Sequence, residues 1–153
     1  MMINRTLKAA IGLAVIAGVS MVPAVFAETL ADFPASTQTG VTYDKDIQPI
    51  FKASCLGCHG AQRQSGRLRL DTLAATLKGG KDGPILVVGK SDQSDIVTYT
   101  ARIGDTVMPP KPRTPRPAAA GSTNTPPPQP PAAKSLTKEQ VGLLRAWIDQ
   151  GAK

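Results

Sequence analysis

Cysteine and histidine occur at only one place in this chain. The two cysteines and the single histidine of its 153 residues fall within the pentapeptide CLGCH, at Cys55, Cys58 and His59. This C-x-x-C-H spacing is typical of covalent haem attachment, because two thiols three positions apart on one turn can each bond a haem vinyl group. The adjacent imidazole then projects toward the iron, for which histidine is the usual proximal ligand. The motif predicts one covalently bound haem c per chain.

Three other uses of these residues remain open. A zinc site needs a fourth good ligand, and the sequence has no further Cys or His. A thioredoxin-like redox pair lies between a strand and a helix of a βαβ unit, and no such alternation is visible. A structural disulfide suits an oxidising compartment but leaves His59 unexplained. Haem attachment accounts for all three residues and is the interpretation that we favour.

The first 27 residues have the pattern of a secretory signal peptide. Arg5 and Lys8 precede an apolar run from Ala9 to Val22, and small residues stand just before Glu28. The alternative is a permanent membrane anchor, but the run is shorter than the roughly 20 residues that a span needs. We therefore expect residues 1–27 to be a signal peptide and the protein to be exported, for instance to the periplasm. Membrane contact is then expected only through this segment or a partner complex.

A sixth iron ligand is suggested by elimination. Three of the four methionines lie in the first 27 residues, which leaves Met108 as the candidate beyond them. Cytochromes c commonly place a Met sulfur opposite the His, and no second His is present. Pro109 and Pro110 follow Met108 and stiffen the segment that would hold the sulfur. The alternative is that Met108 is an ordinary core residue, with a lysine, water or an open site on the iron.

The charge of the exported chain bears on its partners. Without Arg5 and Lys8, 16 basic residues face 11 acidic ones, a formal charge of +5. A modest positive charge favours encounter with acidic redox proteins, as donor and acceptor, and is screened by salt. A merely solvated basic surface is the alternative. No nucleic-acid motif is present, so we expect no nucleic-acid partner.

Sequence patterns predict a linker at residues 28–40 and a mostly α domain at 41–153. Apolar spacing favours short helices at about 48–54, 71–78 and 92–102, with Asp71 capping the second, and a short strand-like run at 85–88. The clearest helix begins at the capping box Thr137-x-x-Gln140 and ends before Gly151. We expect it to cross the helix that precedes the C-x-x-C-H motif, with Leu144 or Trp147 at the crossing.

A change of composition marks residues 111–134. Eight of the 14 prolines of the chain fall in this segment, with Ala, Ser, Thr and Asn between them. Such a composition is typical of a polyproline-like or disordered low-complexity insertion. Four basic residues and no acid occur within it. Its role is either that of a basic docking tether or that of a tolerated surface insertion.

Several segments together resemble the planctomycete-type cytochrome c domain, a branch of the class I cytochrome c fold. They are YDKDIQPIFKASCLGCHG, LRLDT, KGGKDGP, VVGKSDQSDIV, MPP and LTKEQVGLLRAWIDQGAK, within residues 41–110 and 135–153. The resemblance implies about four short helices wrapped around one covalent haem. It also implies thioether bonds from Cys55 and Cys58 and axial ligation by His59 and Met108. The departure is the Pro-rich insertion, where the family has a much shorter loop.

The sequence therefore predicts an exported mono-haem cytochrome that carries single electrons and has no catalytic residues of its own. Two alternatives remain. One is a haem enzyme or gas sensor with an open sixth site on the iron. The other is an electron-entry subunit of a larger oxidoreductase, bound through the Pro-rich segment.

Overall fold

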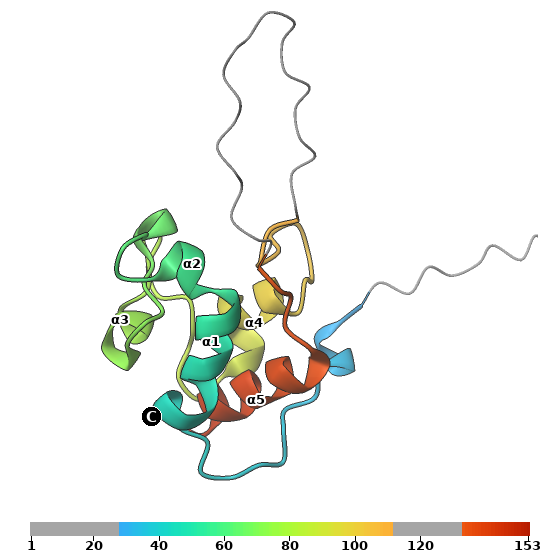
Figure 1. The fold of residues 1–153 in the computed structure, drawn as a ribbon. Helices are drawn as coiled ribbons and strands as arrows, with labels where there is room; N and C mark the ends of the chain where they lie inside the picture. The colour runs from blue at the N-terminus through green and yellow to red at the C-terminus, as the bar shows by residue number, and fades with distance from the viewer. Residues whose placement is uncertain (1–27, 112–132) are drawn as a thin grey trace, which may run out of the picture.

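The backbone forms short helices joined by turns (Figure 1). The structure is a computed structural model that describes residues 28–111 and 133–153, so the predicted signal peptide and most of the Pro-rich insertion lie outside it. The described residues contain five α-helices and no strand; the helices are α1 (Gln48–Ser54), α2 (Leu56–His59), α3 (Leu73–Lys78), α4 (Asp95–Thr100) and α5 (Lys138–Asp149). The predicted mostly α class is confirmed. Among these residues, no helix is both long enough and apolar enough to cross a membrane.

The first helix leads directly into the C-x-x-C-H motif. A π-helical turn, Tyr43–Ile47, precedes α1, whose bounds agree with the predicted helix at 48–54. Pro49 stands in the first turn of α1, where its missing N–H leaves no helix bond unmade. Ile47, Ile50 and Phe51 are buried on one face, as their spacing predicted. The chain bends at Cys55 and continues as the single turn of α2.

The last helix has the predicted capping box. The Thr137 hydroxyl accepts a hydrogen bond from the Gln140 amide, and the Gln140 side chain accepts one from the Thr137 amide at 3.0 Å. The helix buries Val141, Leu144, Trp147 and Ile148. Its aromatic contact is made with Tyr43, in the turn before α1, since the rings of Trp147 and Tyr43 lie 5.9 Å apart. The predicted crossing is therefore shifted to the N-terminal end of α1 (Figure 1).

The middle helices are shorter than their patterns predicted. The expected cap of the second helix was Asp71, but the Thr72 hydroxyl accepts from the Ala75 amide instead. Asp71 is engaged by Arg69 at 2.7 Å, so its carboxylate is not available as a cap. Gly79 ends α3 with φ +81°, a conformation that glycine adopts without strain.

The fourth helix spans six residues, compared with the eleven predicted at 92–102. Residues 91–93 form a separate 3₁₀ turn, since Ser94 is extended. After the helix Arg102 adopts φ 63°, which ends the regular backbone. The run at 85–88 forms no strand, but an isolated bridge joins Val87 to Lys90.

The segment before Val41, which the sequence suggests is a linker, packs on the domain. Phe33 is only 5 % exposed. The guanidinium of Arg145, on α5, donates to the carbonyl oxygens of Leu30 and Phe33. Gly142 allows the close approach, because a Cβ there would lie 2.6 Å from the carbonyl oxygen of Pro34. This segment therefore covers α5.

Candidate functional site

An apolar cavity opens where α1, α2, α4 and the segment 108–110 meet. Its volume is about 710 Å³ when the part open to solvent is included. All four residues predicted to hold the haem line it. They are Cys55, Cys58, His59 and Met108, and the rest of the lining is Ser54, Leu68, Leu70, Ile85, Ile96, Tyr99, Thr100, Pro109, Pro110 and Ala133.

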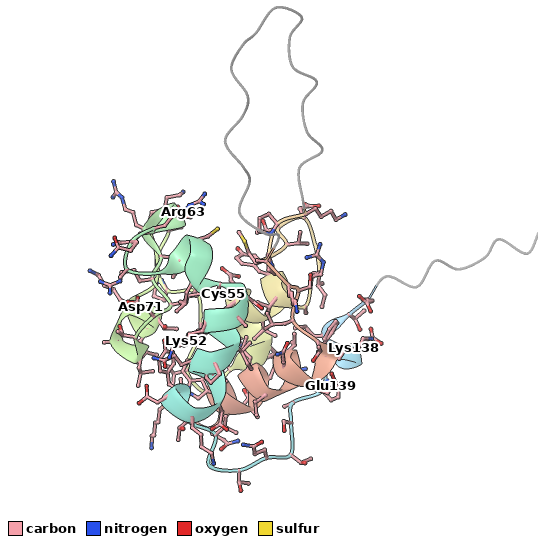
Figure 2. All side chains as sticks on the ribbon, in the orientation of Figure 1. Lys52, Cys55, Arg63, Asp71, Lys138 and Glu139 are labelled. Carbon is pink, nitrogen blue, oxygen red and sulfur yellow. The ribbon has the colours of Figure 1, made fainter. Side chains whose placement is uncertain are left out.

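One turn of backbone presents the two thiols and the imidazole. The amides of Cys58 and His59 both donate to the carbonyl oxygen of Cys55, at 3.0 and 2.9 Å. Neither cysteine is in a disulfide. Cys55 and Cys58 are both partly buried, whereas Figure 2 shows Arg63 pointing outward from the loop after α2. The bend at Cys55 thus turns this motif toward the cavity.

Burial sets the chemistry of the first cysteine. It raises the pKa of the Cys55 thiol to about 12, and the neighbouring Cys58 adds to the effect. A thiol used in disulfide exchange has a lowered pKa and an exposed, electropositive environment. Cys55 therefore lacks the properties of a thiol used in disulfide exchange, and the thioredoxin-like alternative is not supported.

The imidazole of His59 is half-buried, and this burial affects its protonation. Burial lowers the pKa of His59, while the nearby backbone groups of Ser65 and Leu68 act in the opposite direction with smaller effect. Its Nδ1 is buried and has no hydrogen-bond partner among the residues that the structure describes. The imidazole is thus held in the neutral form that ligates metals.

Two further hydrogen bonds fix this side of the cavity. The carbonyl oxygen of His59 accepts from the Leu70 amide at 2.7 Å. The buried Tyr43 hydroxyl donates to the Leu70 carbonyl oxygen, also at 2.7 Å. No local sequence pattern indicates that Tyr43 contacts Leu70, because the two residues are 27 positions apart.

Met108 reaches the cavity from a different part of the chain. Its amide donates to the carbonyl oxygen of Tyr99, at the end of α4, at 2.9 Å. The next carbonyl, that of Pro109, accepts from Nη1 of Arg102 at 2.9 Å. Figure 1 shows α2 apart from the segment that leads to the insertion, and residues of both line the cavity. No sequence pattern indicated that Arg102 contacts this segment.

The residues present fit a haem. The two thiols and the imidazole come from one turn, and the Met108 thioether lines the same cavity. Leucine, isoleucine and proline side chains make the rest of the lining apolar. In residues 28–111 and 133–153, no group of three or more His, Cys, Asp or Glu side chains is arranged to hold a bare metal ion. The zinc alternative therefore has no support in the part of the chain that is described.

One comparison with known proteins identifies the same region. A family model described as Planctomycete cytochrome C matches residues 55–112. The match begins at the first cysteine of the motif and includes Met108, in agreement with the resemblance seen in the sequence. No curated protein and no solved structure matches the chain.

Proposed function

From the premise that residues 55–112 carry a planctomycete cytochrome c domain, we propose that the protein is an exported electron carrier with one covalent haem c. The observation that carries this proposal is that Cys55, Cys58, His59 and Met108 line the same apolar cavity. Three of these residues come from one turn and the fourth from a segment about fifty positions further on, so their meeting on one cavity is not a trivial result of sequence proximity.

Each residue has a distinct part in this proposal. Cys55 and Cys58 would form the thioether bonds to the haem, and His59 and Met108 would ligate its iron. The bound haem supplies an iron that exchanges one electron between its ferric and ferrous forms. The protein holds the imidazole neutral, excludes water with its apolar wall and keeps the thioether at the site.

The lining of the cavity favours a carrier over an enzyme. The Thr100 hydroxyl donates to the Ile96 carbonyl oxygen at 2.7 Å within α4, so it is already engaged. General acid–base catalysis needs a titratable group poised near the operating pH. The described residues that line it include no carboxylate or lysine, and their one histidine is assigned to the iron.

The expected partners are redox proteins with acidic surfaces. The exported chain would carry a charge of +5, and Arg63 is exposed on the loop that follows α2. Electrostatic steering by such charges is screened at about 8–10 Å in physiological salt. Electron transfer with an acidic partner should therefore slow as salt is added.

A second candidate function is that of an electron-entry subunit of a larger oxidoreductase. Pro110 and Ala133, at the two ends of the insertion, both line the cavity. A partner that binds the insertion would therefore sit close to the cofactor. A stoichiometric partner that copurifies with the full chain, and is lost when residues 112–132 are removed, would favour this candidate.

The decisive test is an absorption spectrum of the exported protein after a denaturing gel has shown whether haem stays attached. Covalent haem with the ferric charge-transfer band of sulfur ligation supports the His59/Met108 carrier. Covalent haem with a high-spin spectrum favours the enzyme or sensor. The matched control is the Cys55→Ala/Cys58→Ala double variant, which should migrate without haem. Absence of haem in the wild-type chain, from a host able to attach it, refutes the proposal.

A further inference from the structure

Arg102 occupies an unusual place between the two ends of the insertion. Its Nη1 donates to the Pro109 carbonyl oxygen at 2.9 Å and to the Ser135 hydroxyl at 3.2 Å. Pro109 directly follows Met108, and Ser135 lies beyond the insertion, two positions before the cap of α5. One guanidinium nitrogen therefore joins the segment that carries Met108 to the chain that returns from the insertion.

The backbone of Arg102 supports a specific role. Its φ of 63° lies in the left-handed region, which an L-residue other than Gly, Asn or Asp adopts only with strain. Such a conformation persists where the surroundings over-determine it. Glycine would fit this backbone better, so the side chain is the feature that arginine adds here.

Met108 needs an anchor on both sides. On its N-terminal side its own amide is held by the Tyr99 carbonyl oxygen. On its C-terminal side Pro109 accepts from Arg102, and beyond the insertion Ser135, next to the buried Leu136, accepts from the same nitrogen. A long connection leaves its ends free to separate unless a contact closes it.

We infer that Arg102 is a positioning residue that holds Met108 at the cavity by clamping Pro109 to Ser135. This inference rests on the proposed function, since it assigns a residue that keeps the sulfur in place. Charge-assisted hydrogen bonds are the stronger kind, and the two acceptors lie on opposite sides of the insertion. Arg102 thereby makes the position of Met108 independent of the length of the insertion between Pro109 and Ser135.

The test compares two arginines of the same backbone conformation. Arg102→Gly removes the clamp and relieves the backbone. Arg67→Gly is the matched control, because Arg67 is exposed and has φ 56°. The probe is imidazole, which competes with the sulfur for the ferric iron. Arg102→Gly loses one or two hydrogen bonds to a charged donor. The apparent affinity of imidazole for the ferric iron should therefore rise on the order of tenfold. Arg67→Gly should stay near the wild-type value.

Two further variants separate positioning from general stability. Ser135→Ala should raise the affinity for imidazole less than Arg102→Gly, because the bond to Pro109 remains. Replacement of residues 112–132 by a short Gly-Ser linker should leave the wild-type affinity unchanged. In the Arg102→Gly background the same replacement should restore part of the lost sulfur ligation, because a short connection holds the two ends together without the clamp. A general loss of stability would not be rescued in this way.

A readout that does not depend on the cofactor completes the test. Hydrogen exchange of the Met108 amide should accelerate in Arg102→Gly and not in Arg67→Gly. Unchanged exchange and unchanged imidazole affinity in Arg102→Gly, beside a wild-type sulfur band, overturn the inference and leave the proposed function intact. Covalent haem without that band in the wild-type chain overturns Met108 as a ligand and its positioning together. Absence of haem refutes the proposed function, while amide exchange still decides whether the clamp exists.

Discussion

At the scale of single residues, the cavity is lined by two kinds of sulfur group, thiols and a thioether. Burial raises the pKa of the Cys55 thiol, so this thiol is not poised for disulfide exchange. The thioether of Met108 has no proton to lose and is a soft ligand that suits a haem iron. The two residues therefore have separable effects in the proposed site, one on attachment and the other on the iron.

Met108→Ala is expected to leave the haem covalently attached but to remove the sulfur band. The reduction potential should fall on the order of 100 mV, within the roughly 0.8 V that axial ligands span, because methionine raises it. A gel with haem staining, an absorption spectrum and a redox titration check these points. Retention of the sulfur band in Met108→Ala would exclude this residue as the ligand.

Tyr43→Phe isolates one buried hydrogen bond. The ring keeps its contacts with Phe51 and Trp147, while the Leu70 carbonyl oxygen loses the hydroxyl that donates to it. An unsatisfied buried acceptor costs about 1–3 kcal/mol, and the free energy of unfolding in urea should fall by that amount. The amide of Leu70, which donates to His59, should also exchange faster. An unchanged unfolding midpoint would show that the carbonyl finds another partner.

At the scale of elements, α5 organises the domain through several independent contacts. Its capping box fixes where it begins, and Trp147 packs on Tyr43. Its Arg145 holds the segment before Val41 by two carbonyl oxygens. The C-terminus lies beside the start of α1, where the Tyr43 amide donates to the Lys153 carbonyl oxygen at 2.8 Å (Figure 1). The helix thus joins both ends of the described chain to the turn that leads into the site.

Gly142→Ala tests the contact between α5 and the N-terminal segment. In a helix without other contacts, alanine is more favourable than glycine by about 1 kcal/mol. Here the new Cβ would lie 2.6 Å from the Pro34 carbonyl oxygen, so we expect a net loss of stability and faster exchange of the Ser36 amide, which donates to Gly142. Thermal unfolding gives the sign of the change. A gain in melting temperature would mean that the segment does not pack on α5.

At the scale of the whole molecule, carboxylates stabilise the fold at neutral pH. Hydrogen bonding by the Thr29 backbone lowers the pKa of Asp32, and that by the Thr42 backbone lowers the pKa of Asp46. The pKa of Asp71 is lowered chiefly by the side-chain hydrogen bond that it accepts from Arg69. A carboxylate whose pKa is lower in the folded state contributes its full stabilisation when the pH is above its pKa in the unfolded state. That stabilisation is lost as the pH falls through its pKa in the folded state.

Asp46→Asn should therefore make the acid limb of the stability curve shallower. The stability difference between wild type and variant should be larger at neutral pH than well below the ordinary Asp value of 3.8. Urea unfolding at a series of pH values measures this difference, and Asp44→Asn is the neighbouring exposed control. A difference that does not change with pH would remove Asp46 from the acid response.

The sequence alone determined the features whose cause is local. The C-x-x-C-H motif, the bounds of α1 and the capping box of α5 depend on residues within about one helical turn of one another, so they can be read directly. The same reasoning failed at the cap of α3, because Arg69 competes for Asp71. The helix predicted at 92–102 is also too long, because no sequence pattern indicates the left-handed backbone of Arg102.

The tertiary structure decided which distant segments meet. Tyr43 reaches Leu70, Arg145 reaches Leu30, and Arg102 reaches Ser135, across 27, 115 and 33 positions. Such hydrogen bonds form only when the packing of apolar side chains has already brought the backbones together, and they leave no periodicity in the sequence. The sequence therefore determined which residues are suited to hold a haem. The packing of the helices determined that all four of them line one apolar cavity.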